Sequence, residues 1–238
     1  KLLGVKPPER AEYIRVMMAE LTRIASHTMS IGFLLNDRGA FFTPSLYALE
    51  ERELILDIFE SVSGSRMMCN YFRFGGVVRD ITNADFQKVK QLVEDRLPRK
   101  IDDLDRYLTE NEVLRSRCEG VGVLTAEDAI AFSASGPILR ASGVPYDVRR
   151  ADPYGIYDRF DFEVCHRNHG DVYDRYLVRL DEIRQSLRIL KQVVEQIPEG
   201  GPVMAGKVQY SVRVPAGESY GRVEGPRGEL GFYLVSDG

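Results

Sequence analysis

The sequence predicts an α+β fold that is mainly helical: a bundle of long helices with a small β part. Two observations support this prediction. Apolar residues recur at helical spacing in several long segments, and residues typical of helix caps lie at the segment ends. Later in the chain, YGRVEG and GELGFYLVS flank the turn at 225–228, which is typical of a β-hairpin. We therefore expect a helical-bundle core over 1–200, with an irregular loop tract over 136–170, and a small β segment over 201–238.

The first helix is expected to begin at Pro7-Pro8, because proline is tolerated in the first turn. Its apolar seam consists of Ile14, Met18, Leu21, Ala25, Thr28, Gly32 and Leu35. From Ile24 to Asn36 the segment carries no formal charge and several small residues. We therefore expect other elements to enclose it and to approach it closely. His27 lies off the seam, a position more typical of a hydrogen-bonded core histidine than of a catalytic one.

The second helix is expected from Thr43-Pro44 to Ser63-Gly64, with threonine as N-cap and glycine as stop signal. Glu51 and Arg52 project from its apolar arc, so we expect a structural ion pair there. Four other carboxylates form a narrow stripe, which indicates a solvated face or a contact with a basic partner. The stripe consists of Glu50, Glu53, Asp57 and Glu60.

The same signals predict the remaining elements. They are a loop or short hairpin at 66–81, helix at 83–114 with Asn83 as its cap and a break or kink at Pro98, a short helix at 125–135 and a long helix at 171–197. The tract at 136–170 lacks periodicity and interleaves charged residues with tyrosines, so we interpret it as functional or interfacial rather than core. We expect partner subunits to supply its countercharges.

The composition excludes several classes of function. A net charge of −4 does not suggest a nucleic-acid surface. The three cysteines lie far apart without a CxxC pair, so neither a zinc knuckle nor a cysteine-framed cluster is expected, and the sparse count fits a reducing compartment. P-loop, GxGxxG, GxSxG and HExxH motifs are absent. His166 and His169 lack a nearby third ligand, so we expect them to be polar loop residues and predict no metal site.

No apolar run reaches the roughly 20 residues that a bilayer span requires, and no signal peptide is recognisable. The chain begins with Lys1 instead of methionine and stops directly after a strand-like run. We therefore expect a fragment that lacks both termini of a longer subunit.

Six stretches of the sequence carry a family resemblance that spans nearly the whole chain. They are PERAEYIRVMMAELTRIASH, LNDRGA, EERELILDIFESVSGSRM, NYFRFGGV, SGPILRASG and RVEGPRGELGFYLVSDG. In this order they resemble the hydrogenase-like D subunits of respiratory complex I, the NADH:quinone oxidoreductase. The resemblance implies a fold similar to the large subunit of nickel–iron hydrogenases. It also implies a peripheral position at the cytoplasmic face of the cell membrane, within a complex that couples quinone reduction to proton translocation.

The resemblance implies that the chain binds no cofactor itself. In this family the protein packs against the small B subunit, which holds the terminal [4Fe–4S] cluster, and the two enclose the site where quinone is reduced. The C subunit and the H subunit of the membrane arm are further expected partners. The electron donor and the quinone type do not follow from the sequence.

Asp37 is the residue to which the resemblance assigns a catalytic role. In the family, the aspartate of the LNDRGA block orients a quinone-binding histidine, which belongs to a region before Lys1. Asp37 would then stabilise the histidine cation while quinone is reduced. The alternative is a solvated carboxylate at a helix end, where the helix dipole disfavours negative charge.

Arg66, Met68 and Arg73 are expected to lie near the partner's cluster, again because of the resemblance. Many family members have a histidine where this chain has Met68, so redox-linked protonation at that position is in doubt. Cys69 beside it is expected to be a small buried residue. The alternatives for the whole chain are the large subunit of an energy-converting nickel–iron hydrogenase, or a purely structural scaffold subunit.

Overall fold

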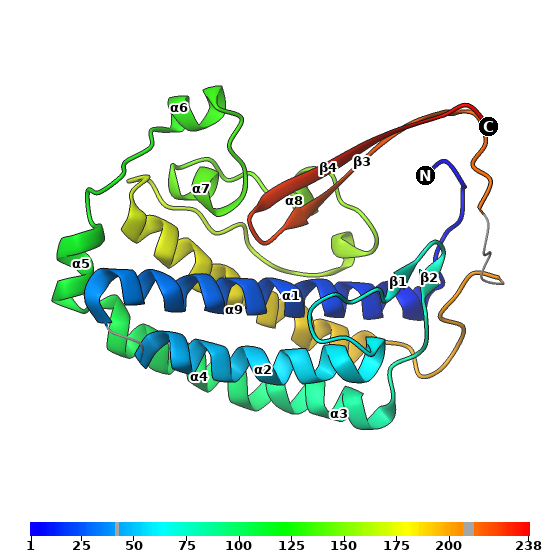
Figure 1. The fold of residues 1–238 in the computed structure, drawn as a ribbon, viewed down its shortest axis with the longest axis horizontal. Helices are drawn as coiled ribbons and strands as arrows, with labels where there is room; N and C mark the ends of the chain where they lie inside the picture. The colour runs from blue at the N-terminus through cyan, green and yellow to red at the C-terminus, as the bar shows by residue number, and fades with distance from the viewer. Residues whose placement is uncertain (41–42, 207–211) are drawn as a thin grey trace.

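The computed structural model describes residues 1–40, 43–206 and 212–238. Long helices run side by side through its body (Figure 1). Helix α1 (Glu9–Leu35) packs against α2 (Thr43–Ser63) on one side and α9 (Val172–Gln196) on another. A segmented helical run lies along α2 and α9. It consists of α3 (Asn83–Gln91), η2 (Leu92–Arg96), α4 (Leu97–Leu104) and η3 (Asp105–Thr109). The architecture is therefore mainly helical, as predicted.

Shorter elements complete the fold. They are α5 (Glu112–Cys118), α6 (Ala126–Ala131), α7 (Gly136–Ala141), α8 (Val148–Ala151) and η4 (Tyr157–Arg159). Two antiparallel hairpins are present. The short one pairs β1 (Phe72–Arg73) with β2 (Gly76–Val77), and the long one pairs β3 (Gly217–Gly225) with β4 (Gly228–Ser236). Gly225 pairs with Gly228 at the predicted turn, which confirms the long hairpin.

Helix α1 begins directly after Pro8 and leads into a π-turn, η1 (Asn36–Ala40), instead of ending at a glycine cap. Its apolar positions, among them Ile14, Leu21 and Ile24, are fully buried. Thr43 begins α2 as predicted, and Gly64 beyond its end has φ of +81°, which glycine adopts at little cost.

The charged residues of α2 have partners that the sequence did not indicate. Arg66 pairs with three members of the acidic stripe, Glu53, Asp57 and Glu60. The basic partner of this stripe therefore comes from the same chain. Glu51 and Arg52 do not pair with each other: Glu51 pairs with Arg96 at 2.9 Å, and Arg52 lies 3.7 Å from Glu53.

The helical run after Thr82 differs from the prediction in two ways. The Thr82 hydroxyl, not Asn83, caps α3 by accepting from the Asp85 N–H at 3.1 Å. The chain also breaks before α5, where the Asn111 side chain caps a new helix. Pro98 lies in the first turn of α4, directly after the π-turn η2, and the helical run continues through it. The helix predicted at 125–135 begins at its Thr125 cap and ends at Ala131.

The structure corrects our prediction for the tract at 136–170, which is that the tract is interfacial and that other subunits supply its countercharges. Instead Arg140, Asp147, Arg149 and Tyr157 are buried, and this chain itself supplies their partners. The tract, which includes α7, α8 and η4, therefore contributes buried charged residues to the core and also carries exposed ones.

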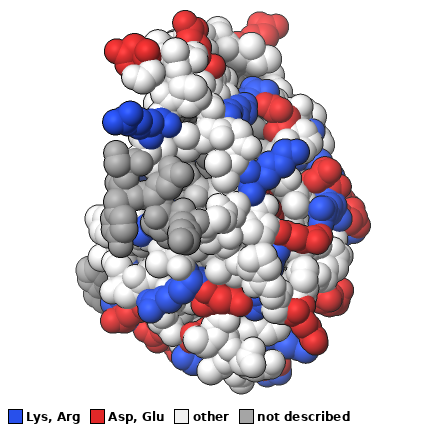
Figure 2. All heavy atoms as spheres, turned by 90° about the vertical axis from the view of Figure 1, so that its right-hand side faces the viewer, with Lys and Arg blue, Asp and Glu red and all other residues white. Residues whose placement is uncertain are grey.

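Within the described residues, no helix is both long and apolar enough to cross a membrane. On the end of the molecule that carries β1 and β2, acidic and basic side chains are interspersed over the surface (Figure 2). This mixture is typical of a solvated protein surface.

Gly32 permits the close approach of α1 and α2 that the small residues predicted. A Cβ atom at this position would lie 2.9 Å from Ala48 Cβ and 3.0 Å from Ser45 Cα. Gly32→Val should therefore lower the free energy of unfolding by about 1–3 kcal/mol, the usual cost of overpacking. Chemical denaturation measures this value. Ser30→Val is the matched control, because Ser30 is exposed on the same helix; equal losses in both variants would contradict a tight contact at Gly32.

Candidate functional site

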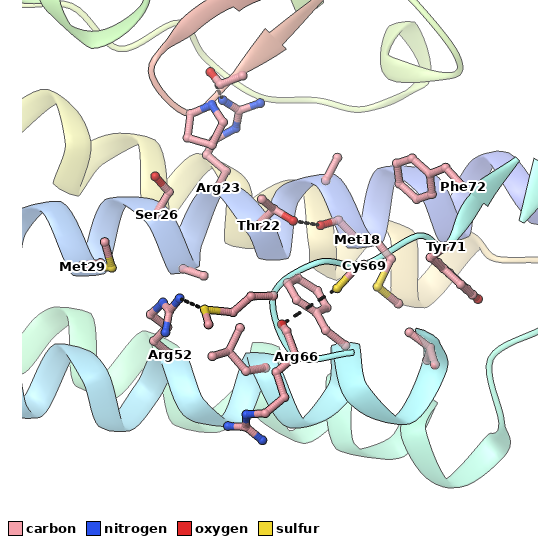
Figure 3. A pocket seen from close by; sticks show the side chains of 18 of the residues that line it. Met18, Thr22, Arg23, Ser26, Met29, Arg52, Arg66, Cys69, Tyr71 and Phe72 are labelled. Carbon is pink, nitrogen blue, oxygen red and sulfur yellow. Dashed lines mark hydrogen bonds between the residues drawn. The ribbon is translucent and has the colours of Figure 1, made fainter. Parts of the chain in front are cut away.

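A cavity of about 530 Å³ lies between α1, α2, the loop that follows α2, and the β3–β4 turn (Figure 3). Its walls are mostly apolar side chains with three arginines among them. The lining side chains include Met18, Met29, Leu56, Phe59, Met67, Tyr71 and Phe72, together with Thr22, Ser26, Arg23, Arg52 and Arg66. An apolar concave site with few polar groups is the usual form of a small-molecule or peptide site.

The three arginines have different surroundings. Arg23 donates to the backbone carbonyls of Gly225 and Glu224 at 3.0 and 2.7 Å, so it fixes the turn over α1. Arg66 is held by the carboxylates of α2. Arg52 points toward the loop, where its Nη2 lies 3.5 Å from Met67 Sδ (Figure 3), and its contact with Glu53 is long, at 3.7 Å. Of the three arginines, Arg52 is therefore the one whose positive charge is least neutralised by nearby carboxylates.

The loop after α2 presents apolar side chains to solvent. Met67, Met68 and Phe74 are 67%, 84% and 76% exposed. Cys69 is exposed too, so the prediction that it is buried was wrong; its Sγ donates to the Ser65 carbonyl at 3.3 Å. Large exposed apolar side chains in one short loop indicate an interaction surface.

The structure places Arg66, Met68 and Arg73 on this one segment. Arg66 lines the cavity. Met68 faces solvent, and Arg73 on β1 donates to the Asn70 side-chain oxygen at 2.6 Å. The three are neighbours in the fold, but only Arg66 reaches the cavity wall.

Asp37 lies apart from them, in the π-turn at the other end of α1. At about 1.5 Å per residue it is roughly 12 Å along the axis from Met29, the lining residue of the cavity that is nearest to it in sequence. Asp37 is exposed and forms no ion pair with any residue that the structure describes. The adjacent backbone is held in place, because Arg117 Nη1 donates to the Arg38 carbonyl at 2.6 Å.

The face of α1 between the cavity and Asp37 is open. Thr22, Ser30, Phe33 and Asp37 are exposed at helical spacing along it. The expectation that other elements of the chain enclose this uncharged segment all round was therefore wrong for this face. An uncharged helix face that none of the described residues covers points to a cover from elsewhere.

Behind this face lies a buried charge network. It consists of Glu20, Arg23, His27, Arg140, Asp147, Arg149, Glu182 and Glu224, all buried. These residues come from α1, α7, α8, α9 and β3, and from the residue before α8. Buried charges of this kind persist only when they are paired.

Glu20 is the centre of one half of the network. Its carboxylate pairs with Arg23 at 3.1 Å and Arg149 at 3.2 Å, and it accepts from the hydroxyls of Ser186 and Tyr157, each at 2.7 Å. Burial by itself raises the pKa of Glu20, but the two arginines and the two hydroxyls lower it to about 2. Glu20 is therefore ionised at neutral pH.

Glu182 is the centre of the other half. One oxygen accepts from Arg140 Nε at 2.7 Å and the other from His27 Nε2 at 2.6 Å. Arg140 also reaches Glu224 Oε1 at 3.0 Å, which connects α9 to the long hairpin. Burial lowers the pKa of His27, so a neutral imidazole donates its N–H to an ionised carboxylate. The prediction of a hydrogen-bonded core histidine is confirmed.

Burial raises the pKa of Cys165 to about 12 and also raises that of Cys118, so both side chains are thiols in this structure. His169 Nδ1 lies 3.1 Å from the Asp174 carboxylate, and His166 is exposed. In the described part of the chain, no three potential ligand side chains gather into a metal-binding group.

Comparison with known proteins decides the family. The family model described as the respiratory-chain NADH dehydrogenase 49 kDa subunit matches residues 37–238. The chain belongs to this family. It is 56% identical to a D subunit of the NADH-quinone oxidoreductase of Roseiflexus sp. (strain RS-1), across the whole chain and 65% of that relative.

Other members of the family are similar over the same part of their length. Identity is 54% to the D subunit of Dehalococcoides mccartyi (strain 195) and 46% to a D subunit of Rhizobium meliloti, in each case over the whole chain and 64% of the relative. The chain thus spans slightly less than two thirds of these relatives.

Sequence reasoning missed Arg52 as a cavity residue and the buried network as a whole. A signal was present, because Arg140 and Glu224 each lie inside a block that carries the family resemblance, SGPILRASG and RVEGPRGELGFYLVSDG. The pairing itself joins residues far apart in the sequence, so no local pattern indicates it.

We expect the buried charge network to make the free energy of unfolding depend on pH in the acidic range. The Glu20 pKa falls from 4.5 to about 2 on folding, so its contribution is complete above about pH 4.5 and is lost as pH falls toward 2. Glu20→Gln should lower the free energy of unfolding at pH 7 by about 3 kcal/mol and flatten its pH dependence in that window. Denaturation between pH 2 and 7 tests this. Glu195→Gln, at an exposed position, should change stability by less than about 0.5 kcal/mol; matching curves for both variants would refute the pairing.

Proposed function

We propose that this chain is part of the quinone-reducing region of a membrane-associated NADH:quinone oxidoreductase, beside the terminal [4Fe–4S] cluster of a partner protein. The observation that carries the proposal is the open, uncharged face of α1 beside an apolar cavity with arginines in its wall. Membership of the 49 kDa subunit family supports it. The names of the relatives favour a quinone oxidoreductase over a nickel–iron hydrogenase, although we also propose a fold similar to the hydrogenase large subunit.

The open face suits a quinone for a physical reason. A quinone ring and its isoprenoid chain are apolar, and they require a surface with few charges. Reduction to the quinol consumes two electrons and two protons, so the site also needs an electron donor in reach and groups that handle protons. In this proposal the partner's cluster supplies the electrons, and Asp37 at the end of the face orients and charges the group that donates a proton.

The loop after α2 suits the cluster-bearing partner. Its exposed methionines adapt their shape to an apposed surface, and the arginines beside it offer positive charge to a cluster that gains an electron. We therefore propose that Arg66, Met68 and Arg73 lie at the interface with this partner, the B subunit. The C and H subunits would complete the assembly at the cytoplasmic face of the membrane.

Asp37→Asn tests the proposed role in the intact complex. The substitution keeps size and hydrogen bonding but removes the charge, so the pKa of a neighbouring imidazolium falls. We expect assembly to persist and quinone reduction to fall by up to about 10²–10⁴-fold, the usual contribution of general acid catalysis. Electron transfer to an artificial acceptor upstream of the quinone should be unchanged.

Asp103→Asn is the matched control, because Asp103 is an exposed helical aspartate on α4. It should leave both activities unchanged. If Asp37→Asn also retains normal quinone turnover, Asp37 is a solvated helix-end carboxylate, and its loss should relieve a few tenths of a kcal/mol of unfavourable dipole interaction.

Met68→Asp tests the proposed partner surface. Since Met68 is 84% exposed, the unfolding free energy of the chain should change by less than about 0.5 kcal/mol. Burying an unpaired carboxylate at an interface is costly, so recovery of the cluster-bearing partner with the chain should fall about tenfold or more. Tyr107→Asp, at an exposed aromatic residue of η3, is the control. Equal recovery in both variants would show that the loop does not face the partner.

A further inference from the structure

Three arginines lie near the place where the first half of α9 meets the long hairpin, and their positive charges have no ion-pair partner among the described residues. We call Arg175 and Arg179 of α9 and Arg227 of the β3–β4 turn the arginine cluster. Arg140 binds Glu182 of α9 at 2.7 Å and Glu224 of β3 at 3.0 Å, which places the β3–β4 turn beside the part of α9 that carries Arg179. Burial lowers the pKa of Arg179, Glu182 raises it, and the charges of Arg175 and Arg227 lower it again. Three like charges in one place are unfavourable without a counterion.

The described part of the chain provides no ion pair for these three guanidinium groups. Arg179 Nη1 donates to the Arg175 carbonyl at 2.9 Å. Arg175 Nη2 donates to the carbonyls of Gly122 and Gly170 at 2.6 and 2.8 Å. The nearby carboxylate, Glu182, is already occupied, because its two oxygens bind Arg140 and His27. The positive charge of the cluster is therefore not neutralised internally.

Buried donors in the same region also lack acceptors. Arg175 Nε and Arg140 Nη2 are buried without a hydrogen-bond partner among the described residues. Arg140 is fully buried and shares Glu182 with His27. In contrast, Arg184 further along α9 pairs with Asp102 and Asp105. Arg38 Nε and Arg167 Nε are two further buried donors without a partner among the described residues, so the deficit adds to the charge of the cluster but is not confined to it.

The cluster adjoins the candidate functional site. Gly225 and Pro226 line the cavity, and Arg227 follows them directly. Arg23 binds the Gly225 carbonyl and so holds this turn over α1. Arg179 also acts on His27, which lies one residue after the cavity residue Ser26. The arginine cluster therefore adjoins the cavity through the β3–β4 turn.

We propose that the arginine cluster docks an acidic segment of a partner polypeptide, whose carboxylates pair with Arg179, Arg175 and Arg227. Guanidinium groups bind carboxylates by paired hydrogen bonds, which would neutralise the excess charge. A peptide suits the site better than a lipid headgroup, because the cluster is split between a helix and a turn, and the same turn lines an apolar cavity that a second part of the peptide can reach. The inference rests on the proposed function, since it assumes that this chain works in an assembly.

The first experiment identifies the partner chemically. Arg227→Lys in the intact complex keeps the charge and introduces an amine, which a carbodiimide joins by an amide bond to a carboxylate in direct contact, with loss of water. We expect mass spectrometry to find a cross-link from position 227 to an aspartate or glutamate of another protein of the complex. Cross-links only within this chain, or none, would overturn the proposal.

The second experiment measures the interaction. Arg227→Glu places like charges together at the docking site, so retention of the chain in the complex should fall about tenfold or more at low salt. The retention of this variant in the complex should also no longer depend on the concentration of added salt. Arg106→Glu is the control, because Arg106 is exposed and lies over the ring of Tyr107. Equal effects in both variants would overturn the proposal.

The outcomes separate this inference from the proposed function. A wild-type chain that does not co-purify with quinone reductase activity would refute the proposed function. A complex that assembles, reduces quinone and gives no cross-link from Arg227→Lys would refute the acidic segment alone. If removal of lipid weakens retention and vesicles with anionic phospholipid restore it in the wild type but not in Arg227→Glu, the cluster binds lipid phosphate and the peptide proposal fails.

Discussion

The burial of several charged side chains is the constraint on which the rest of the structure depends. An isolated charge in the interior costs several kcal/mol, and removing one member of a buried pair typically costs about 3–5 kcal/mol. Arg23, Arg140 and Arg149 are therefore compatible only with arrangements that bring Glu20, Asp147, Glu182 and Glu224 within reach. These residues belong to distant parts of the chain, so the network specifies how α1, α9, the tract at 136–170 and the long hairpin meet.

The network also explains how a rigid scaffold lies beside an open surface. Arg23 pairs with Glu20 and at the same time binds the carbonyls of the β3–β4 turn. The turn is thereby fixed at the edge of the cavity, although the strands behind it present Leu230, Phe232 and Leu234 to solvent. Positioning by buried pairs leaves the outer face of α1 free of charge, which is the property that a quinone or an apposed protein requires.

Close helix packing sets the other wall of the cavity. Gly32 lets α1 and α2 approach at one end of the pair, where a side chain would meet Ala48 and Ser45. Toward the other end, larger residues such as Met18 and Phe59 line the cavity between the same two helices. One helix pair thus provides both a tight contact at Gly32 and a concave site further along.

The sequence by itself determined the long helices, their capping residues and the β3–β4 turn, because these follow from local periodicity and backbone preference. Its six blocks also indicated the family. Only the tertiary structure decided which charges pair: Glu51 with Arg96, and the acidic stripe with Arg66. It also decided that Cys69 is exposed and that the tract at 136–170 contributes buried charged residues to the core. The physical reason is that a pattern shows which face of a segment is apolar, whereas the partner of a buried charge depends on which distant segment packs against that face.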